Sequence, residues 1–380
     1  MYYLDHAAAT PMDGRVAAVM QPYLSELFFN PSSPYAPAVA VRRDYEAAKH
    51  RIAVCIGGKS DEVIVTAGAT ESINLMVHST SGHVVTTAIE HHAVLAATRD
   101  RDCTIVPVGS SGIVQPTTIG VAIKATTQLV TVALANNELG TIQPIREISE
   151  IVRAERRRRL EAGELTPIYF HCDASQGVNQ LDVHVARLGV DALTLNAGKL
   201  YGPKQVGLLW TASHVVVRPL IAGGGQERGV RSGTENVAGV IGFATALELA
   251  SQHRKSETVR LATLRNQLES RLITEFPAAV ITGSTKKRLA GHLHISFPGI
   301  DAERLVFALE TKGVLVATGS ACAANYGTRS HVLTAIGVTP EIADGSLRIS
   351  LGRLNDTTSI AMATKLLIEA LRTEYARLSR

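Results

Sequence analysis

Residues 168–176 read IYFHCDASQ, a short apolar run that ends in an aspartate and small polar residues. Short runs rich in aromatic and β-branched residues are typical of buried strands. We predict strands at residues 63–66, 83–87, 104–107, 129–133, 168–172, 192–195 and 207–210, and helices between them at 71–78, 93–99, 146–161 and 182–188. Repeated alternation of strand and helix predicts an α/β fold, with a mainly parallel central sheet and helices on both faces.

The last third of the chain predicts a smaller α+β unit. A long helical region, broken only by polar turns, is expected from about residue 234 to 275. Strands are predicted at 292–297, 314–317 and 347–351, and helices at 301–312 and 358–378. We therefore expect a large domain over residues 12–250 and a small C-terminal domain over residues 251–380, joined by the N-terminal segment 1–11.

Composition limits the class of protein. The chain has 380 residues, of which 46% are hydrophobic and 19% charged, as in globular proteins. Its 38 basic and 34 acidic residues give a net charge of +4, which argues against nucleic acid as a partner. Four scattered cysteines without a CxxC pair exclude a disulfide scaffold and a zinc ribbon, and they suit a reducing cytoplasm. No signal peptide is visible, and no apolar run approaches the roughly 20 residues that span a bilayer. We expect a cytoplasmic protein.

One run of positive charge stands out, with four consecutive arginines at residues 156–159. We interpret it as the solvated face of a surface helix that extends away from the sheet. A patch for nucleic acid or an acidic partner is the alternative, for which the small net charge gives little support.

Two residues follow predicted central strands. Asp173 ends the opening stretch, at the edge where open α/β sheets bind ligands, and such a carboxylate can hold a pyridinium nitrogen protonated. A helix N-cap is the alternative for Asp173. Lys199 lies among small residues before a Gly-Pro turn, and its amine could form a Schiff base with an aldehyde cofactor. An exposed loop lysine is the alternative.

Two further turns add to this pattern. In residues 66–72, TAGATES, backbone N–H groups and the Thr70 hydroxyl could bind a phosphate at a helix N-terminus, although a plain helix cap would look the same. In residues 90–93, EHHA, the imidazole of His91 could stack on a flat cofactor or move protons. A surface histidine pair is the alternative there.

Phosphate turn, histidine, carboxylate and lysine, each at a predicted strand end and in this order, together resemble the fold-type I pyridoxal-phosphate (PLP) enzymes. Further motifs are similar to those of NifS/IscS-like cysteine desulfurases, in the class V aminotransferase family. They are YLDHAA (3–8), NPSS (30–33), GATES (68–72), NNELG (136–140), GGGQERG (223–229), RSGT (231–234), GSAC (319–322) and RISLGR (348–353). The resemblance covers nearly the whole chain, and the spacing from Cys322 to residues 330–333 is similar to that of members with a longer catalytic loop.

The resemblance implies a role for each matching residue. Lys199 would form the Schiff base with PLP, Asp173 would pair with the ring nitrogen, and Gln176 would bond the phenolic oxygen. His91 would stack on the ring and act in acid/base steps, and Cys322 would be the nucleophile. The implied cofactor-binding residues are Ala69, Thr70, His91, Asn137, Asp173, Gln176, Asn196, Lys199 and Thr234, with Thr234 reaching the phosphate across a homodimer interface. Asn137 and Arg348 would orient the substrate.

The implied reaction removes sulfur from L-cysteine, giving L-alanine and a persulfide on Cys322 for a sulfur-acceptor protein, in iron–sulfur cluster assembly or tRNA thiolation. Residues 318–327 are small and polar with flanking glycines, which favours an accessible thiol at Cys322, whereas Cys55, Cys103 and Cys172 are expected to be packing residues. A selenocysteine lyase, another class V enzyme, and a weakly active sulfur-transfer scaffold are alternatives. His292 and His294 share one face of a predicted strand, but without another ligand we predict no metal site.

The sequence departs from the family pattern just before Lys199. Members usually carry Ser-x-His there, whereas this chain has Asn196 and Gly198. Glycine has no side chain to replace the imidazole as a phosphate ligand, and a hydrogen bond to a charged group is worth about 1.5–3 kcal/mol. We therefore predict weaker retention of PLP. Ala67, where a serine is usual, is a further departure.

Overall fold

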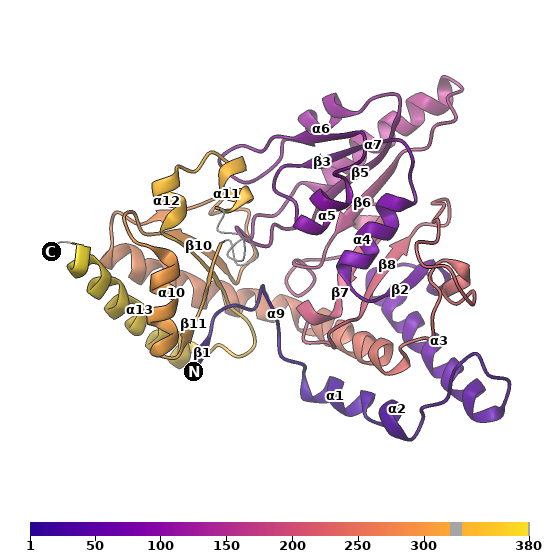
Figure 1. The fold of residues 1–380 in the computed structure, drawn as a ribbon, viewed down its shortest axis with the longest axis horizontal. Coiled ribbons are helices and arrows are strands. Elements are labelled where there is room, and N and C mark those ends of the chain that lie inside the picture. The colour runs from indigo at the N-terminus through magenta and orange to yellow at the C-terminus, as the bar shows by residue number, and fades with distance from the viewer. Residues whose placement is uncertain (320–328, 379–380) are drawn as a thin grey trace.

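The computed structural model of the protein describes residues 1–319 and 329–378 (Figure 1). Cys322, the predicted nucleophile, lies outside these ranges. The larger part of the described structure is built on a seven-stranded sheet of order β2-β8-β7-β6-β5-β3-β4. Its strands are β2 (Val63–Thr66), β3 (His83–Thr87), β4 (Cys103–Val106), β5 (Thr127–Ala133), β6 (Tyr169–Asp173), β7 (Ala192–Asn196) and β8 (Gly207–Thr211). Neighbouring strands from β4 to β7 pair in parallel, and β8 runs antiparallel to β7 and β2.

Helices cover both faces of this sheet. They are α1 (Gly14–Met20), α2 (Pro22–Ser25), α3 (Ala36–Ile56), α4 (Ala69–His78), α5 (His92–Ala97), α6 (Pro116–Ala122), α7 (Ile145–Glu161) and α8 (Val185–Leu188). Successive strand residues point to opposite faces. Val63 and Val65 accordingly join the core with α3, while Ile64 joins a second cluster with residues of α4. The predicted α/β class with a mainly parallel sheet is confirmed.

The C-terminal part forms a four-stranded antiparallel sheet of order β12-β13-β10-β9. Its strands are β9 (Val280–Ile281), β10 (His292–Ser296), β12 (Ala317–Thr318) and β13 (Ser346–Ser350), with helices α10 (Ala302–Thr311), α11 (His331–Ala335), α12 (Pro340–Asp344) and α13 (Thr357–Leu378). At the start of the chain β1 (Tyr2–Tyr3) pairs in parallel with β11 (Val314–Leu315). The single strand predicted at 314–317 is therefore wrong, because its two halves pair in different sheets.

The helix α9 (Val237–Glu275) connects the two parts as one continuous helix (Figure 1). The polar turns predicted within it are wrong. Residues 251–260 are polar but contain neither glycine nor proline, so nothing in the backbone stops the helix there. Apolar residues up to Leu247 join the core of the large sheet, and those from Leu261 onward join a separate core that also contains Leu4. We propose that the domain boundary, predicted near residue 250, falls within α9.

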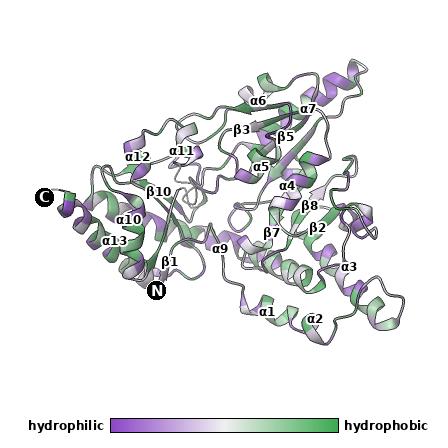
Figure 2. Ribbon diagram, viewed as in Figure 1, coloured by the Kyte–Doolittle hydropathy of each residue, from purple (hydrophilic) through white to green (hydrophobic). Residues whose placement is uncertain are grey.

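Short polar connections and amphipathic helices surround these cores. Figure 2 shows hydrophobic residues along the strands, while peripheral helices such as α10 and α13 carry both hydrophobic and hydrophilic residues. In residues 1–319 and 329–378 no helix is both long and apolar enough to cross a membrane.

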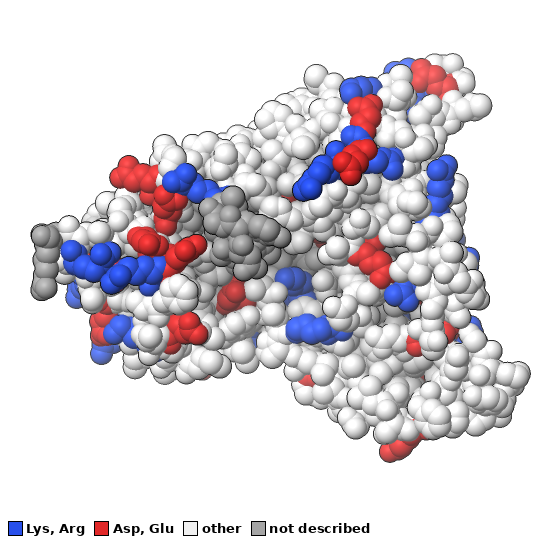
Figure 3. Space-filling model, viewed as in Figure 1, with Lys and Arg blue, Asp and Glu red and all other residues white. Residues whose placement is uncertain are grey.

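The arginine run lies on α7, and the interpretation as a solvated face is wrong for Arg159. Its side chain is only 2% exposed and donates to Glu155 and to the carbonyl oxygens of Lys124 and Thr127. Arg158 does lie at the surface, in ion pairs with Glu155 and Glu164. Figure 3 likewise shows basic and acidic residues close together on one face of the molecule rather than a patch of one sign.

Candidate active site

A cleft of about 350 Å³ opens at the carboxyl ends of β3, β5, β6 and β7. Residues from the small sheet and the N-terminal segment form its other side. The predicted site residues that line the cleft are Ala69, Thr70, His91, Asn137, Asp173, Gln176, Asn196, Lys199 and Arg348. Thr234 is exposed and is not among the lining residues, and Cys322 lies outside the described ranges. The cleft thus brings together predicted site residues that are up to 279 positions apart in the sequence, from Ala69 to Arg348.

Asp173 is the last residue of β6, where it pairs in register with Ala133 of β5 and Thr194 of β7. Its Oδ1 accepts a hydrogen bond from the backbone N–H of Ser175 at 3.0 Å. No described helix begins here, since the next one is α8 at Val185, so the helix-cap interpretation does not apply. The central position of β6 and the bond from Ser175 fix the carboxylate at the cleft.

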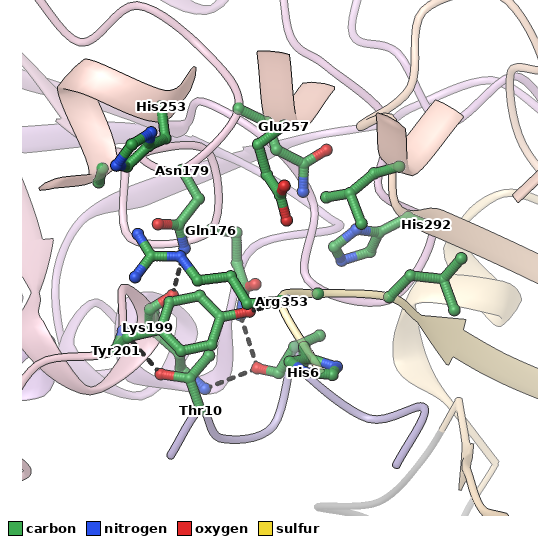
Figure 4. Close-up of a pocket in the computed structure, with 16 residues that line it drawn as sticks. His6, Thr10, Gln176, Asn179, Lys199, Tyr201, His253, Glu257, His292 and Arg353 are labelled. Atoms are coloured by element: carbon green, nitrogen blue, oxygen red, sulfur yellow. Dashed lines mark hydrogen bonds between the residues drawn. The ribbon is translucent and has the colours of Figure 1, made fainter. Parts of the chain in front are cut away.

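Lys199 follows β7 in a short 3₁₀ turn, η2 (Ala197–Lys199). Its Nζ donates to the carbonyl oxygens of Ala7 and Ala8, each at 2.7 Å, so the amine lies against the N-terminal segment rather than in an open loop. A second, smaller cavity of about 40 Å³ adjoins the cleft at Ala7, Gln176 and Lys199. Figure 4 shows Lys199 and Gln176 at this cavity.

His91 is the N-cap of α5, and its Nδ1 accepts a hydrogen bond from the backbone N–H of Ala93 at 3.1 Å. Burial lowers the pKa of His91, Asp173 opposes that shift and Lys199 reinforces it. A histidine that accepts at Nδ1 and has a lowered pKa is neutral at pH 7, with its proton on Nε2. Its Nε2–H can therefore donate a proton during a reaction, and the ring can then take a proton back at Nε2.

The carboxyl group of Glu90, the residue before this histidine, is buried. Its oxygens accept hydrogen bonds from the Thr87 hydroxyl at 2.7 Å and from the backbone N–H of Ala133 at 3.0 Å. Burial, reinforced by the charge of Asp173, raises the pKa of Glu90 to about 8. Glu90 is not among the residues that line the cleft, so this buried acid lies behind the site rather than in it.

Arg348 lies on the opposite side of the cleft, in the middle of β13. Its Nη2 donates to Asp5 Oδ1 at 2.8 Å and its Nη1 to the carbonyl oxygen of Asn137 at 3.2 Å. Its Nε is buried without a partner among the described residues. One guanidinium therefore links the small sheet, the N-terminal segment and the turn after β5.

Several lining residues were not predicted. Asn136 holds the turn after β5, because its Oδ1 accepts from the N–H groups of Glu138 and Leu139. His92 and His331 face each other with ring centroids 4.4 Å apart, and Ser330 Oγ donates to Glu138 Oε2 at 2.7 Å. The motifs at 136–140 and 90–93 contain some of these residues, but a single sequence does not reveal that α11 returns to the large sheet.

His292 and His294 are buried on β10. Over residues 1–319 and 329–378 no group of three or more His, Cys, Asp or Glu side chains is arranged to hold a metal ion.

The phosphate turn opens onto an adjoining cavity of about 590 Å³, which shares Ala69, Thr70, Asn196 and Lys199 with the cleft. The first hydrogen bond within α4 runs from Ser72 N to Gly68 O, so the N–H groups at the start of the helix are available for a ligand. Gly68 has φ +151°, and a Cβ at Gly207 would lie 2.6 Å from Gly68 Cα. Glycine at both positions lets the turn approach the sheet closely.

These donors and acceptors fit PLP. The amine suits an aldehyde, and the carboxylate at a strand end suits a ring nitrogen. The neutral histidine suits a flat ring, and the helix N-terminus suits a phosphate. The fit rests on functional groups that come from separate strand ends and meet in one cleft.

Comparisons with known proteins agree with a PLP-binding site. The Aminotransferase class-V family model matches residues 2–362. A curated protein of Dictyoglomus turgidum named Cysteine desulfurase IscS is 40% identical over 362 residues, covering 92% of this chain and 89% of the relative. Another of the same name, from Methanosarcina thermophila, is 37% identical over 94% of this chain and 89% of its own length.

Solved structures are similar over the same extent. One described as a NifS-like protein superposes with a TM-score of 0.90 at 33% identity, covering 98% of this chain and all of its own. One described as SspA in complex with cysteine gives a TM-score of 0.78 at 32% identity, covering 92% of this chain and 99% of its own. The protein therefore belongs to the class V aminotransferase family of PLP-dependent, fold-type I enzymes. Within that family it is a cysteine desulfurase of the IscS and NifS type, which confirms the resemblance in the sequence.

Proposed function

We propose that this cleft takes the sulfur of L-cysteine, releases L-alanine and transfers the sulfur to Cys322 as a persulfide. The observation that carries the proposal is the meeting of Lys199, Asp173 and His91 with Arg348 in one cleft. The first three come from strand ends of the large sheet, and the arginine comes from the small one. This arrangement supports a site in which the first three residues hold PLP and Arg348 holds the carboxylate of an amino acid.

The residues that would hold PLP divide by chemistry. Lys199 supplies the amine for the aldehyde, Asp173 the carboxylate for the ring nitrogen, and Gln176 an amide for the phenolic oxygen. Ala69, Thr70 and Asn196 supply donors for the phosphate. When bound, PLP acts as an electron sink that stabilises negative charge on the substrate carbon skeleton.

Substrate orientation is assigned to Arg348 and Asn137. Arg348 lines the cleft, and a planar guanidinium matches a carboxylate with two parallel hydrogen bonds. Asp5 already accepts from Nη2 and so fixes the plane of the guanidinium before substrate arrives. Asn137 lies beside Arg348, because its carbonyl oxygen accepts from Nη1.

The sulfur transfer uses the chain's own thiol. The Cys322 thiolate attacks the substrate sulfur, an S–S bond forms and the substrate C–S bond breaks. The bonding electron pair stays on the carbon fragment, which takes up a proton and leaves as alanine. His91, neutral at pH 7, and Lys199 are placed to carry the protons of these steps.

The persulfide then passes to an acceptor protein, either an iron–sulfur cluster scaffold or a tRNA-thiolation relay. We also propose a homodimer in which Thr234 completes the phosphate site of the partner subunit. Thr234 is exposed, and the segment that carries it is tied to the phosphate turn, since Arg231 Nε donates to Glu71 Oε1 at 2.9 Å and Ala67 N donates to Glu71 Oε2 at 2.7 Å.

The test incubates the PLP-loaded protein with L-cysteine and a thiol and measures sulfide and alanine. Lys199→Ala and Cys322→Ala are each expected to lower the rate by roughly 10³-fold or more, because the amine and the nucleophile have no substitute. Cys103→Ala, which changes a half-buried thiol far from the cleft, is the matched control and should keep the rate. Equal alanine release by Cys322→Ala and the unmodified protein would refute the persulfide step.

A further inference from the structure

The position that lacks the usual histidine, Gly198, does not leave an empty space. A Cβ built on Gly198 would lie 3.2 Å from Lys204 Cδ and 3.4 Å from Asn196 Oδ1. The aliphatic stem of Lys204 therefore already occupies the side of the loop on which a residue at position 198 would project. A histidine could enter only if Lys204 moved.

Lys204 lies on the phosphate side of the site. Together with Thr70, Asn196, Gly198 and Lys199 it lines the cavity of about 590 Å³ onto which the phosphate turn opens. Its Nζ donates to a neutral acceptor, the carbonyl oxygen of Thr10, at 2.5 Å. In the part of the chain that the structure describes, this ammonium forms no ion pair. Its charge is thus available to an anion in the cavity.

The loop that carries Lys204 is held in a defined conformation. Tyr201 and Gln205 have φ of 63° and 58°, in the left-handed region that few non-glycine residues adopt. Thr10 fastens the loop on both sides of Lys199, because Thr10 Oγ1 donates to Gly198 O at 3.1 Å and accepts from Tyr201 N at 2.8 Å. The backbone of Lys204 is therefore fixed relative to Gly198 and the phosphate turn.

We propose that Lys204 supplies the positive charge to the cofactor phosphate that Gly198 cannot, an inference that rests on the proposed function. Lysine is a point charge on a flexible four-carbon stem, and rotation of that stem can turn Nζ from Thr10 O to a phosphate oxygen. The exchange is favourable, because the ammonium gains Coulomb attraction to a negatively charged phosphate in place of a hydrogen bond to a neutral carbonyl oxygen. Lys204 then offsets the loss of PLP retention predicted from Gly198.

The test compares two probes on the cofactor-free protein, PLP and pyridoxal, which lacks the phosphate. Equilibrium titration followed by absorbance should show that Lys204→Ala binds PLP roughly tenfold to a hundredfold more weakly, the loss expected for one hydrogen bond to a charged group. Its affinity for pyridoxal should stay unchanged. Lys204→Arg should keep most of the PLP affinity, and Lys312→Ala, which removes an exposed lysine at the end of α10, is the matched control.

A second comparison uses Gly198→His. The double variant Gly198→His with Lys204→Ala should recover PLP affinity relative to Lys204→Ala alone. The shortened side chain at position 204 leaves space for the imidazole, which can then donate a hydrogen bond to the phosphate. Added to the unmodified protein, Gly198→His should give no comparable gain, since Lys204 occupies that space. Equal losses for PLP and pyridoxal in Lys204→Ala, or no loss for either, would overturn the inference and leave a role in loop structure only.

These outcomes are separable from the proposed function. If the unmodified protein fails to bind PLP or to release alanine from cysteine, the proposed function fails. If it does both while Lys204→Ala matches it with both probes, only the assignment of Lys204 fails.

Discussion

The two sides of the cleft are built by different means. On the large-sheet side, His91, Asp173 and Lys199 lie at or just after the ends of three parallel strands of one sheet, so the sheet itself brings them together. On the other side, Arg348 sits in the middle of β13 and is oriented by Asp5 and by the backbone of Asn137, which belong to two other segments.

This difference predicts that the two sides of the cleft affect different kinetic constants. Strand ends in one sheet are fixed by backbone pairing, which suits groups that must be aligned with a rigid cofactor. Arg348 depends on side-chain partners from distant segments, so its orientation is adjustable by single substitutions. Substitutions on the large-sheet side should affect kcat, and substitutions at Arg348 or its partners should affect KM.

Of the substitutions that compare the two sides of the cleft, Asp173→Asn should have the largest effect. The amide keeps the shape but cannot hold a proton on a ring nitrogen, and loss of one electrostatic group at a reacting centre costs about 10²–10³ in kcat. KM for cysteine should change little, and steady-state alanine release measures both constants. Asp182→Asn, which alters a surface carboxylate paired with Arg187 and Arg254, should leave both constants unchanged. A normal kcat in Asp173→Asn would contradict the prediction that substitutions on the large-sheet side affect kcat.

Arg348→Lys should have a smaller effect of a different kind. Lysine keeps the charge but cannot form two parallel hydrogen bonds, so KM should rise by roughly tenfold to a hundredfold while kcat falls less. Asp5→Asn should raise KM only severalfold, because it loosens the guanidinium without removing it. A fall in kcat at constant KM in both variants would contradict this prediction and show that Arg348 acts like the groups on the large-sheet side.

The same contrast explains what the sequence could predict. Strands of the large sheet are short apolar runs, and a polar residue directly after such a run falls at the ligand-binding edge, so Asp173 and Lys199 were identifiable from the local pattern. Arg348 was identified only through the family resemblance, because its position depends on pairing between distant segments.

Other features depend on contacts that no local pattern encodes. The split between β11 and β12 follows from pairing with β1 in one case and β13 in the other. Arg159 is buried because it donates to three backbone carbonyls from other segments. The neighbourhood of Gly198 and Lys204 likewise arises from a tight turn, whose left-handed residues Tyr201 and Gln205 carry no glycine signature.

The smallest expected effect compares one buried histidine from each sheet. His171 on β6 is bonded at both ring nitrogens, to the hydroxyls of Thr131 at 2.9 Å and Thr194 at 2.8 Å. His292 on β10 has no partner for either nitrogen among the described residues. Burial lowers the pKa of His171 to about 4 and that of His292 to about 3. One histidine is thus a bonded part of its sheet, and the other is an unsatisfied polar group.

Both lowered values give stability the same dependence on pH. In the unfolded chain a histidine takes up a proton below about pH 6.5, whereas the folded protein resists that proton until the pH nears 4 for His171 or 3 for His292. Above 6.5 neither form is charged and there is no effect. Below it the unfolded state binds more protons, so the free energy of unfolding falls as the pH drops from about 6.5 toward the folded pKa.

His292→Leu should therefore stabilise the protein by about 1 kcal/mol at pH 7, since it removes unsatisfied polar atoms, and should reduce the loss of stability between pH 6.5 and 4. His171→Leu should destabilise it by about 1–3 kcal/mol at pH 7, because two buried hydroxyls lose their partner. Urea unfolding midpoints at pH 7 and pH 5 measure both effects. If the two variants shift the midpoint in the same direction at pH 7, bonding of the ring nitrogens does not distinguish the two sheets. If His292→Leu keeps the full difference between pH 7 and pH 5, His292 is not a source of the acid sensitivity.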